Sequence, residues 1–570
     1  MPTVTSKAEF GSDVVVEMLG LLGIDKVAYN PGSSFRGLHD SFVNFPGAPE
    51  MVLCCHEEIA VAVAHGYWRA TGKPMAAAIH SMVGLQHASM AIYNAWCERA
   101  PVIVMGGTGP VSAINRRNWI DWVHTALVQG NQVRDYTKWD DQPHSLGAFA
   151  ESAVRAYKIA MTPPMGPVLI VAGAEIQSHA MEGARPRIPK LVMTSPPAGD
   201  MGAVAEAARM LVAAERPMII PERYARTPNG IKLLVELAET LQAPVNNRER
   251  MNFPNRHPLA GNGGAGYQPD VTLALEVQDI LTEARTARTR NAKVIHISAV
   301  SLSHKSNIQD FGHYADIDLD IGADAEATLP YLIEACKKLL TADRQRALKD
   351  RGAKLAEAHR KNREADVEAL QYGWNASPVS VGRIAAELWP LIKNEDWSFV
   401  SPQGFVGNWP NRLWNMEKHY HYIGGQGAGG MGYGAPASVG AALANRKYGR
   451  FSINIQTDGD FNYSPGVFWT AAHHRIPLLS IMHNNRGYHQ EVMFVEQMAS
   501  AHNRGAERAG IGTKLWDPDI DYASIAKGYG LYAEGPITDP KDLAPALKRG
   551  IERVKKGEPV LIDVVTQPRG

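Results

Sequence analysis

Asp458 and Asn485, separated by 27 residues, are the side chains in this sequence best placed to do chemistry together. Asp458 lies in the run Thr-Asp-Gly-Asp, and Asn485 is followed closely by Gly487. Mg²⁺ prefers oxygen ligands and is usually held by one or two protein groups together with phosphate oxygens. The carboxylate of Asp458, the amide oxygen of Asn485 and the carbonyl of Gly487 are therefore predicted to bind a magnesium ion that holds a diphosphate.

The elements around these residues are expected to form one strand–helix–strand unit. Residues 450–456 alternate in polarity and predict a strand, 467–474 predict a helix, and 476–482 predict the next strand. Both polar segments then lie at the carboxyl ends of neighbouring parallel strands, where open α/β sheets bind ligands. The alternative is an ordinary unit of this kind with polar turns.

Two acids, Glu57 and Glu58, begin an apolar helix pattern near the amino end, and Gly72 and Pro74 are expected to end that helix. Acids in the first turn of a helix favour its dipole, so a purely solvated pair is one interpretation. A functional role for one of these acids is favoured only if motifs elsewhere in the chain indicate binding of the same ligand.

A glycine-rich segment over 424–437 contains the bulky apolar residue Met431. Glycines let the backbone approach a ligand closely, whereas Met431 could simply fill a core. Residues 425–430 also match the dinucleotide fingerprint, but no acid occurs between Met431 and Thr457, where the fingerprint requires one. The same pattern recurs at 261–266, so the motif is weak here, and a nicotinamide or flavin dehydrogenase is an outside alternative.

Taken together, these motifs resemble those of the thiamine diphosphate enzymes. Their signature is Gly-Asp-Gly, a gap of this length and Asn-Asn; this chain has Thr457 in place of the first Gly. The tail Gly-Tyr-x-Arg-Ala-Thr-Gly-Lys-Pro of the first helix also matches. The turn Asn-Pro-Gly-Ser at 30–33 and the His-Ser pair at 80–81 are similar to those of benzoylformate decarboxylases, within the pyruvate decarboxylase and acetolactate synthase group.

The resemblance implies a role for each residue of the cofactor site. Glu57 would hydrogen-bond the pyrimidine ring and so turn the neighbouring ring amine into a base. Met431 would support the bent cofactor, and the carbonyl of Gly429 would accept from its amine. The implied cofactors are thiamine diphosphate and Mg²⁺, and the cofactor-binding set is Glu57, Gly429, Met431, Asp458, Gly459, Asp460, Asn485, Gly487 and Tyr488.

The resemblance also implies a substrate pocket. Ser33 would bind substrate and His80 would transfer protons, although a turn serine and a core histidine are the plain alternatives. His124 is similar to a catalytic histidine of pyruvate decarboxylases, or is a loop histidine. Gln490 and Glu491 would face the thiazolium ring. Benzoylformate decarboxylases have an apolar residue at the position of Glu491, so this acid differs from them. The plain interpretation of Glu491 is an acid on the surface of a helix. The remaining histidines His87, His419 and His421 are expected to be structural, the last two in a strand with Tyr420 and Tyr422.

The implied reaction is the non-oxidative decarboxylation of a 2-oxo acid to an aldehyde. The alternative in the same chemistry is a carboligase, or a lyase that cleaves an acyloin or 2-hydroxy ketone. A binding homologue without activity is disfavoured because Glu57, Asp458 and Asn485 are all present.

The amino-acid composition argues against binding to nucleic acid or to an anionic membrane. Lys plus Arg and Asp plus Glu number 58 each among 570 residues, so no basic field suits nucleic acid or an anionic membrane. The four cysteines, Cys54, Cys55, Cys97 and Cys336, lack metal or disulfide spacing. No unbroken run of 18 apolar residues occurs. We expect a cytoplasmic protein that acts on a small molecule.

The chain is expected to be α/β, with three doubly wound parallel-sheet domains. A proline-rich linker over 183–199 and a charged helical stretch over 342–368 separate them. The predicted domains are 1–182, which would bind the pyrimidine, 200–338 in the centre, and 372–570, which would bind the diphosphate. The resemblance implies a site between the first domain of one subunit and the last domain of another, hence a homodimer or homotetramer.

Overall fold

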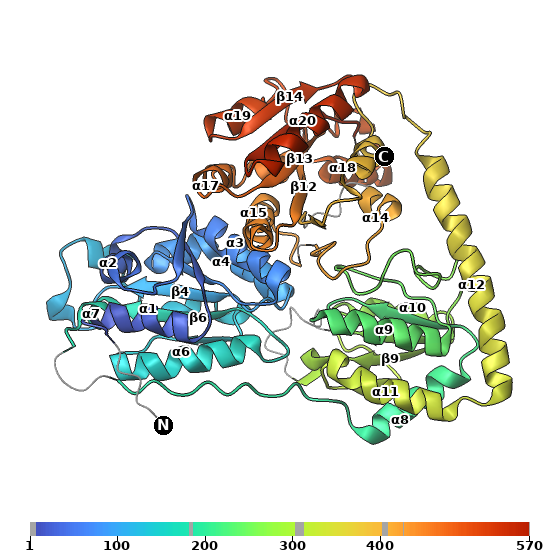
Figure 1. The fold of residues 1–570 in the computed structure, drawn as a ribbon, viewed down its shortest axis with the longest axis horizontal. Coiled ribbons are helices and arrows are strands. Elements are labelled where there is room, and N and C mark those ends of the chain that lie inside the picture. Colours follow the sequence, from blue (N-terminus) through green and yellow to red (C-terminus); the bar gives the residue numbers. More distant parts are fainter. Residues whose placement is uncertain (1–6, 182–185, 303–312, 402–407, 426, 569–570) are drawn as a thin grey trace.

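The computed structural model describes residues 7–181, 186–302, 313–401, 408–425 and 427–568. Three β-sheets follow one another along the chain, and all their strand pairs are parallel. In Figure 1 the first sheet and its helices lie at the left, the second at the lower right and the third at the top. The predicted fold class, α/β with three parallel sheets, is confirmed; the exact domain boundaries stay a prediction.

The first sheet has six strands in the order β2-β1-β3-β4-β6-β5. Its inner strands are buried on both faces, which is why β3 consists only of small and apolar residues. The strands are β1 (Lys26–Tyr29), β2 (Glu50–Leu53), β3 (Ala76–Ile79), β4 (Ile103–Thr108), β5 (Trp139–Asp141) and β6 (Val168–Gly173). The helices are α1 (Gly11–Leu21), α2 (Arg36–Asn44), α3 (Glu57–Thr71), α4 (Ser81–Cys97), α5 (Ile120–His124), α6 (Leu146–Met161) and α7 (Ala174–Ser178).

The second sheet has four strands in the order β10-β9-β8-β7. They are β7 (Pro217–Pro221), β8 (Val271–Leu275), β9 (Lys293–Ile297) and β10 (Leu319–Ile321), with helices α8 (Met201–Ala213), α9 (Pro228–Leu241), α10 (Ile280–Arg288) and α11 (Ala325–Leu339). Residues 261–266 lie in a loop. The first helix after them is α10, which begins only at Ile280, so the second glycine match lacks the helix that a dinucleotide site requires.

The third sheet has five strands in the order β11-β12-β13-β15-β14. They are β11 (Trp397–Phe399), β12 (Phe451–Thr457), β13 (Leu478–Asn484), β14 (Tyr532–Ile537) and β15 (Pro559–Val565). The helices are α13 (Val381–Ile392), α14 (Trp409–Leu413), α15 (Gly434–Arg446), α16 (Asp458–Phe461), α17 (Val467–His473), α18 (His489–Ala501), α19 (Tyr522–Gly528) and α20 (Leu543–Lys555). The unit β12–α17–β13 matches the predicted strand–helix–strand within two residues at each boundary.

The second and third sheets are joined by the long charged helix α12 (Ala342–Ala369), which runs along the outer side of the molecule in Figure 1. Only Leu348, Gly352 and Leu355 of this helix are buried. A helix that is polar on most of its faces suits a connection exposed to solvent.

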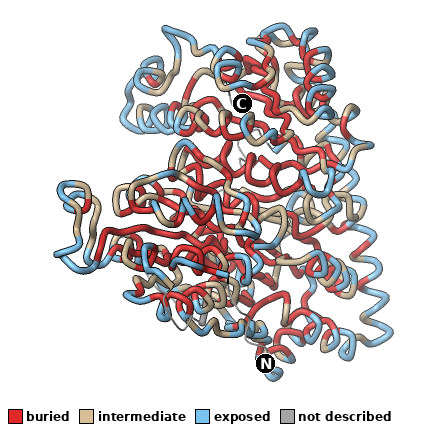
Figure 2. Tube along the Cα trace, turned by 60° about the vertical axis from the view of Figure 1, so that its left-hand side comes forward, coloured by how far each residue is buried: buried red, intermediate tan, exposed pale blue. Residues whose placement is uncertain are grey.

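The first and third domains meet where α3 packs on α15, near the centre of Figure 1. Two glycines make this close approach possible. A Cβ atom on Gly66 would lie 1.9 Å from the carbonyl oxygen of Ala437, and one on Gly440 would lie 2.0 Å from that of Val63. The apolar core is continuous across this contact, and Figure 2 shows buried segments running through the interior between the domains.

The predicted strand around His419–Tyr422 is wrong. Tyr422 makes only an isolated bridge to Phe399, because the chain turns at Lys418–His421 instead of extending. Among the described residues, no helix is both long and apolar enough to cross a membrane.

Candidate active site

Asp458 lies directly after β12, at the carboxyl edge of the third sheet. It begins the short helix α16 and is 1% exposed. Its Oδ1 accepts a hydrogen bond from the backbone N–H of Gly459 at 2.9 Å, and its Oδ2 accepts from that of Gly487 at 3.1 Å. The loop that follows β13 is thus fixed to the loop that follows β12, as the predicted site requires.

The side-chain amide of Asn485 lies beside this carboxylate. One of its two terminal atoms is 3.1 Å from Oδ1 of Asp458 and 2.9 Å from the carbonyl oxygen of Gly487. If this atom is nitrogen it donates to both oxygens, and if it is oxygen then three oxygens converge without a proton between them. The second orientation provides the all-oxygen ligand set that Mg²⁺ prefers.

The burial of Asp458 also favours the binding of a cation beside its carboxylate. Burial raises the pKa of its carboxyl to about 7, although the N–H groups of Gly459 and Gly487 act to lower it. A divalent cation next to the carboxylate would offset the cost of burying this negative charge. The residues therefore fit a magnesium ion in both ligand chemistry and electrostatics.

The glycine-rich loop is held in place by Asp460. Its two carboxylate oxygens accept from the backbone N–H groups of Gly432 at 2.8 Å and Gly434 at 3.1 Å, and from Nε2 of Gln456 at 2.8 Å. Within this loop Gly429 has a φ of 67°, which favours glycine. Asp460 thus acts on the predicted cofactor site by anchoring the loop that contains Gly429.

A cavity of about 270 Å³ opens beside these residues. Most of the predicted cofactor residues of the third domain line it, together with Gln490 and Glu491. A Cβ atom on Gly459 would lie 2.6 Å from the Tyr488 ring, so the glycine allows that ring to form one wall. The lining residues are Gly429, Met431, Thr457, Gly459, Asp460, His483, Asn485, Gly487, Tyr488, His489, Gln490 and Glu491.

In the first domain, Glu57 is the first residue of α3 and is buried. Its Oε2 lies 3.0 Å from Nδ1 of His87 on α4. A Cβ atom on Gly84 would lie 2.8 Å from Oε1 of Glu57, so this glycine leaves space for the carboxyl. His87, which was expected to be structural, contacts the predicted proton donor.

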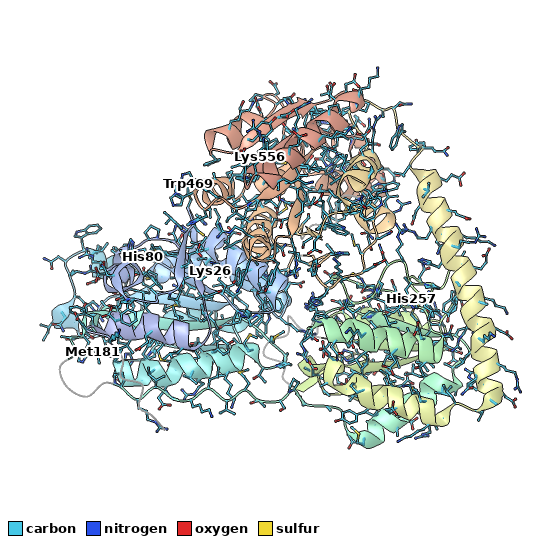
Figure 3. The ribbon with its side chains drawn as sticks, viewed as in Figure 1. Lys26, His80, Met181, His257, Trp469 and Lys556 are labelled. Atoms are coloured by element: carbon cyan, nitrogen blue, oxygen red, sulfur yellow. The ribbon has the colours of Figure 1, made fainter. Side chains whose placement is uncertain are left out.

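His80 follows β3 and directly precedes α4, with no capping hydrogen bond from its side chain; Figure 3 labels it in the first domain. Its Nδ1 lies 2.9 Å from Oγ of Ser34, and its ring meets that of His124 edge to face at 4.6 Å. Burial and His124 lower the pKa of His80, against the influence of Glu57, which raises it. The structure therefore brings His80 and His124 together, as the predicted roles require.

The serine that contacts His80 is Ser34, whereas the predicted substrate-binding serine is the half-buried Ser33. A Cβ atom on Gly32 would lie 2.3 Å from Nδ1 of His80, so the turn packs directly on the imidazole. Two adjacent serines after Pro-Gly give no sequence signal for which one faces the histidine. The contact between His87 and Glu57 joins two helices and had no local signal either.

The two groups of residues remain separate within one chain. None of Ser33, Glu57, His80 and His124 lines the 270 Å³ cavity in the described part of the chain. The acid of α3 that faces the third domain is Glu58, since a Cβ atom on Gly432 would lie 3.3 Å from its Oε1. Burial and the neighbouring charge of Asp460 raise the pKa of Glu58 to about 7. The predicted site residues of the first domain and those of the third domain therefore form two separate groups within one chain, called half-sites below.

Comparisons with known proteins agree with this division. Residues 10–130 match the model for the N-terminal TPP binding domain of thiamine pyrophosphate enzymes, and residues 403–564 match the model for the C-terminal TPP binding domain. Benzoylformate decarboxylase of Pseudomonas aeruginosa is 25% identical over 97% of this chain and 98% of its own length. A probable acetolactate synthase large subunit of Methanocaldococcus jannaschii is 23% identical over 98% of this chain and 92% of its own.

Solved structures share the whole fold. A thiamine diphosphate-dependent 4-hydroxybenzoylformate decarboxylase of Rhodococcus jostii matches with a TM-score of 0.77 at 20% identity, covering 98% of this chain and 99% of its own. Benzoylformate decarboxylase of Polynucleobacter necessarius matches with a TM-score of 0.77 at 19% identity, covering 99% of both chains. With both cofactor-binding domains matched in sequence, the chain belongs to the thiamine pyrophosphate enzymes, in the group that includes benzoylformate decarboxylase and acetolactate synthase.

Proposed function

We propose that this protein uses thiamine diphosphate and Mg²⁺ to decarboxylate a 2-oxo acid to an aldehyde without oxidation. The observation that carries the proposal is the convergence of Asp458, Asn485 and the Gly487 carbonyl at the edge of a cavity walled by the glycine-rich loop. An oxygen ligand set next to a loop that admits a close ligand suits a metal-bound diphosphate.

The third domain binds the cofactor in this proposal. Asp458, Asn485 and the carbonyl of Gly487 would hold the metal ion, while Met431 would pack against the cofactor and the carbonyl of Gly429 would accept from its amine. Gly459, Asp460 and Tyr488 complete the wall of the site. Bound thiamine diphosphate supplies the carbon nucleophile and the electron sink, and the protein supplies orientation and proton transfers.

The first domain supplies the proton chemistry. Glu57, which is buried, would donate a proton to the pyrimidine nitrogen of the bound cofactor. His80 and His124 move protons at the substrate, as does Glu491 from the third domain, while Ser33 and Gln490 bind the substrate. The contact between the His80 and His124 rings supports a shared role for the two histidines.

We infer that the working enzyme is a homodimer or a homotetramer, because the half-sites of one chain do not meet. Both half-sites adjoin exposed apolar side chains, which are costly to leave in water and mark interaction surfaces. On the first domain these are Val111, Ile114, Trp119, Trp122, Val123, Leu127 and Val128. On the third domain they are Met493, Phe494, Val495 and Met498 of α18, together with Ile511 and Trp516.

The second candidate function is carboligation or its reverse, the cleavage of an acyloin or 2-hydroxy ketone. Several relatives named as acetolactate synthases, 21–23% identical over almost the whole chain, support it. Glu491 also distinguishes this pocket from that of benzoylformate decarboxylases.

Product analysis tests both candidates. Protein loaded with thiamine diphosphate and Mg²⁺ is given a panel of aromatic and aliphatic 2-oxo acids and 2-hydroxy ketones, and aldehyde and carbon dioxide are measured. Equal amounts of aldehyde and carbon dioxide from a 2-oxo acid support decarboxylation. Aldehydes from a 2-hydroxy ketone without carbon dioxide support the second candidate, and failure to bind the cofactor contradicts both.

A further inference from the structure

Among the residues that the structure describes, His87 makes the only side-chain hydrogen bond to Glu57. Its Nδ1 lies 3.0 Å from Oε2 of Glu57, where the side chain of Glu57 is 9% exposed and that of His87 is 58% exposed. A buried carboxyl that must present one oxygen to a ligand needs a partner that fixes the other oxygen. His87 is placed to be that partner.

The ring of His87 is itself held in position by His56. His56 caps the start of α3, and its Nδ1 accepts from the backbone N–H of Glu58 at 3.2 Å. The two imidazole rings stack at 4.8 Å with an angle of 25° between their planes. The capped His56 therefore provides a fixed surface against which the His87 ring lies.

Gly84, one turn before His87 on α4, determines what the other oxygen of Glu57 meets. A side chain at this position would begin 2.8 Å from Oε1, so only glycine leaves that oxygen uncovered. His87 thus holds Oε2, and Gly84 leaves space beside Oε1, which accepts no hydrogen bond from the described part of the chain.

The same three side chains could also be considered as metal ligands, since His56, Glu57 and His87 each offer an atom within 4.8 Å of the others. The stacked rings argue against this. The lone pairs of an imidazole lie in the plane of its ring, and two nearly parallel planes do not direct them at one ion. In addition, Nδ1 of His56 already accepts a backbone hydrogen bond.

We propose that His87 is a positioning residue that holds the carboxyl of Glu57 in the orientation from which it donates a proton to the cofactor. The inference rests on the function proposed above for Glu57. In the neutral tautomer with a proton on Nδ1, His87 donates to Oε2 and leaves the proton of Glu57 on the side that faces the ligand.

Two variants separate positioning from packing. In H87N an amide N–H can replace the Nδ1 donor but cannot gain a charge, whereas H87F keeps the stacked ring and has no donor. The measurement is the rate at which the proton on the reactive carbon of bound thiamine diphosphate exchanges with deuterium in D₂O, followed by NMR in protein loaded with Mg²⁺. This assay needs no substrate.

We expect H87F to slow this exchange by a factor on the order of 10 to 100, as is typical when a hydrogen bond that orients a reacting group is lost. H87N is expected to stay within about threefold of the wild type at pH 8, because its amide N–H can replace the Nδ1 donor. Cofactor affinity, measured by calorimetry, is expected to stay within about tenfold in both variants.

The inference is overturned if H87F exchanges as fast as the wild type, if H87N is as slow as H87F, or if both variants lose cofactor binding. E57Q distinguishes this from failure of the proposed function. Fast exchange in E57Q would remove Glu57 as proton donor and with it the proposed role. Slow exchange in E57Q together with normal exchange in H87F would reject only the role of His87.

Discussion

Replacing Asp458 with Asn is expected to change stability in opposite directions at high and low pH. Burial raises the pKa of this carboxyl from 3.8 to about 7. Between these values the folded protein binds more protons here than the unfolded chain does, so the free energy of unfolding falls as the pH rises. At about 1.4 kcal/mol for each pKa unit, the loss is about 4 kcal/mol above pH 7 in cofactor-free protein.

Asn has no charge to bury, so the free energy of unfolding of D458N does not fall as the pH rises through 7. Its NH₂ group cannot accept from the N–H of Gly459 or Gly487, one of which loses its partner at a cost of about 1–3 kcal/mol. After treatment with EDTA, D458N is therefore expected to unfold with a free energy about 1–3 kcal/mol above the wild type at pH 8. At pH 4 it is expected to be less stable than the wild type, because only the lost hydrogen bond remains.

Thiamine diphosphate and Mg²⁺ should reverse the order at pH 8. Ligand at 1,000 times its Kd stabilises a folded protein by about 4.1 kcal/mol, and D458N lacks the charged metal ligand that this binding needs. Urea unfolding followed by tryptophan fluorescence measures all of these states. Equal stabilisation of both proteins by cofactor and Mg²⁺ would refute the metal site, and a D458N protein less stable than the wild type in EDTA at pH 8 would refute the electrostatic argument.

Three further substitutions test the half-site of the first domain and its packing. E57Q is expected to abolish turnover while calorimetry still detects cofactor and Mg²⁺; normal turnover would remove Glu57 as proton donor. H80A is expected to slow turnover by a factor of about 10² to 10⁴, and a loss below about tenfold would favour a structural role beside Ser34. G66A is expected to lower the thermal midpoint by several degrees, because its Cβ would begin 1.9 Å from the Ala437 carbonyl oxygen. An unchanged midpoint would show that α3 and α15 separate easily.

Local patterns predicted the elements around the cofactor site well. The strands predicted over 450–456 and 476–482 correspond to β12 and β13. The positions of Asp458 and Asn485 at the ends of these strands follow from this topology. Tyr420 and Tyr422 do not form the predicted strand, since a short alternating run extends only when a neighbouring strand pairs with it.

Contacts between residues that are far apart in the sequence could not be predicted from local patterns. Ser33 and Ser34 have the same chemistry, and the packing of Gly32 on the His80 ring decides that Ser34 faces Nδ1. The contact of His87 with Glu57 depends on the angle between α3 and α4. No periodicity within either helix encodes that angle.

The sequence by itself determined the fold class, the family resemblance and the chemistry of the proposed metal ligands, because residue types and their spacing can be read along the chain. Only the tertiary structure decided which acid of α3 faces which domain: Glu58 lies near Asp460 within the chain, while Glu57 points toward His87 and Gly84. The physical reason is that neighbouring residues of a helix point in different directions, and helix packing selects what each one meets.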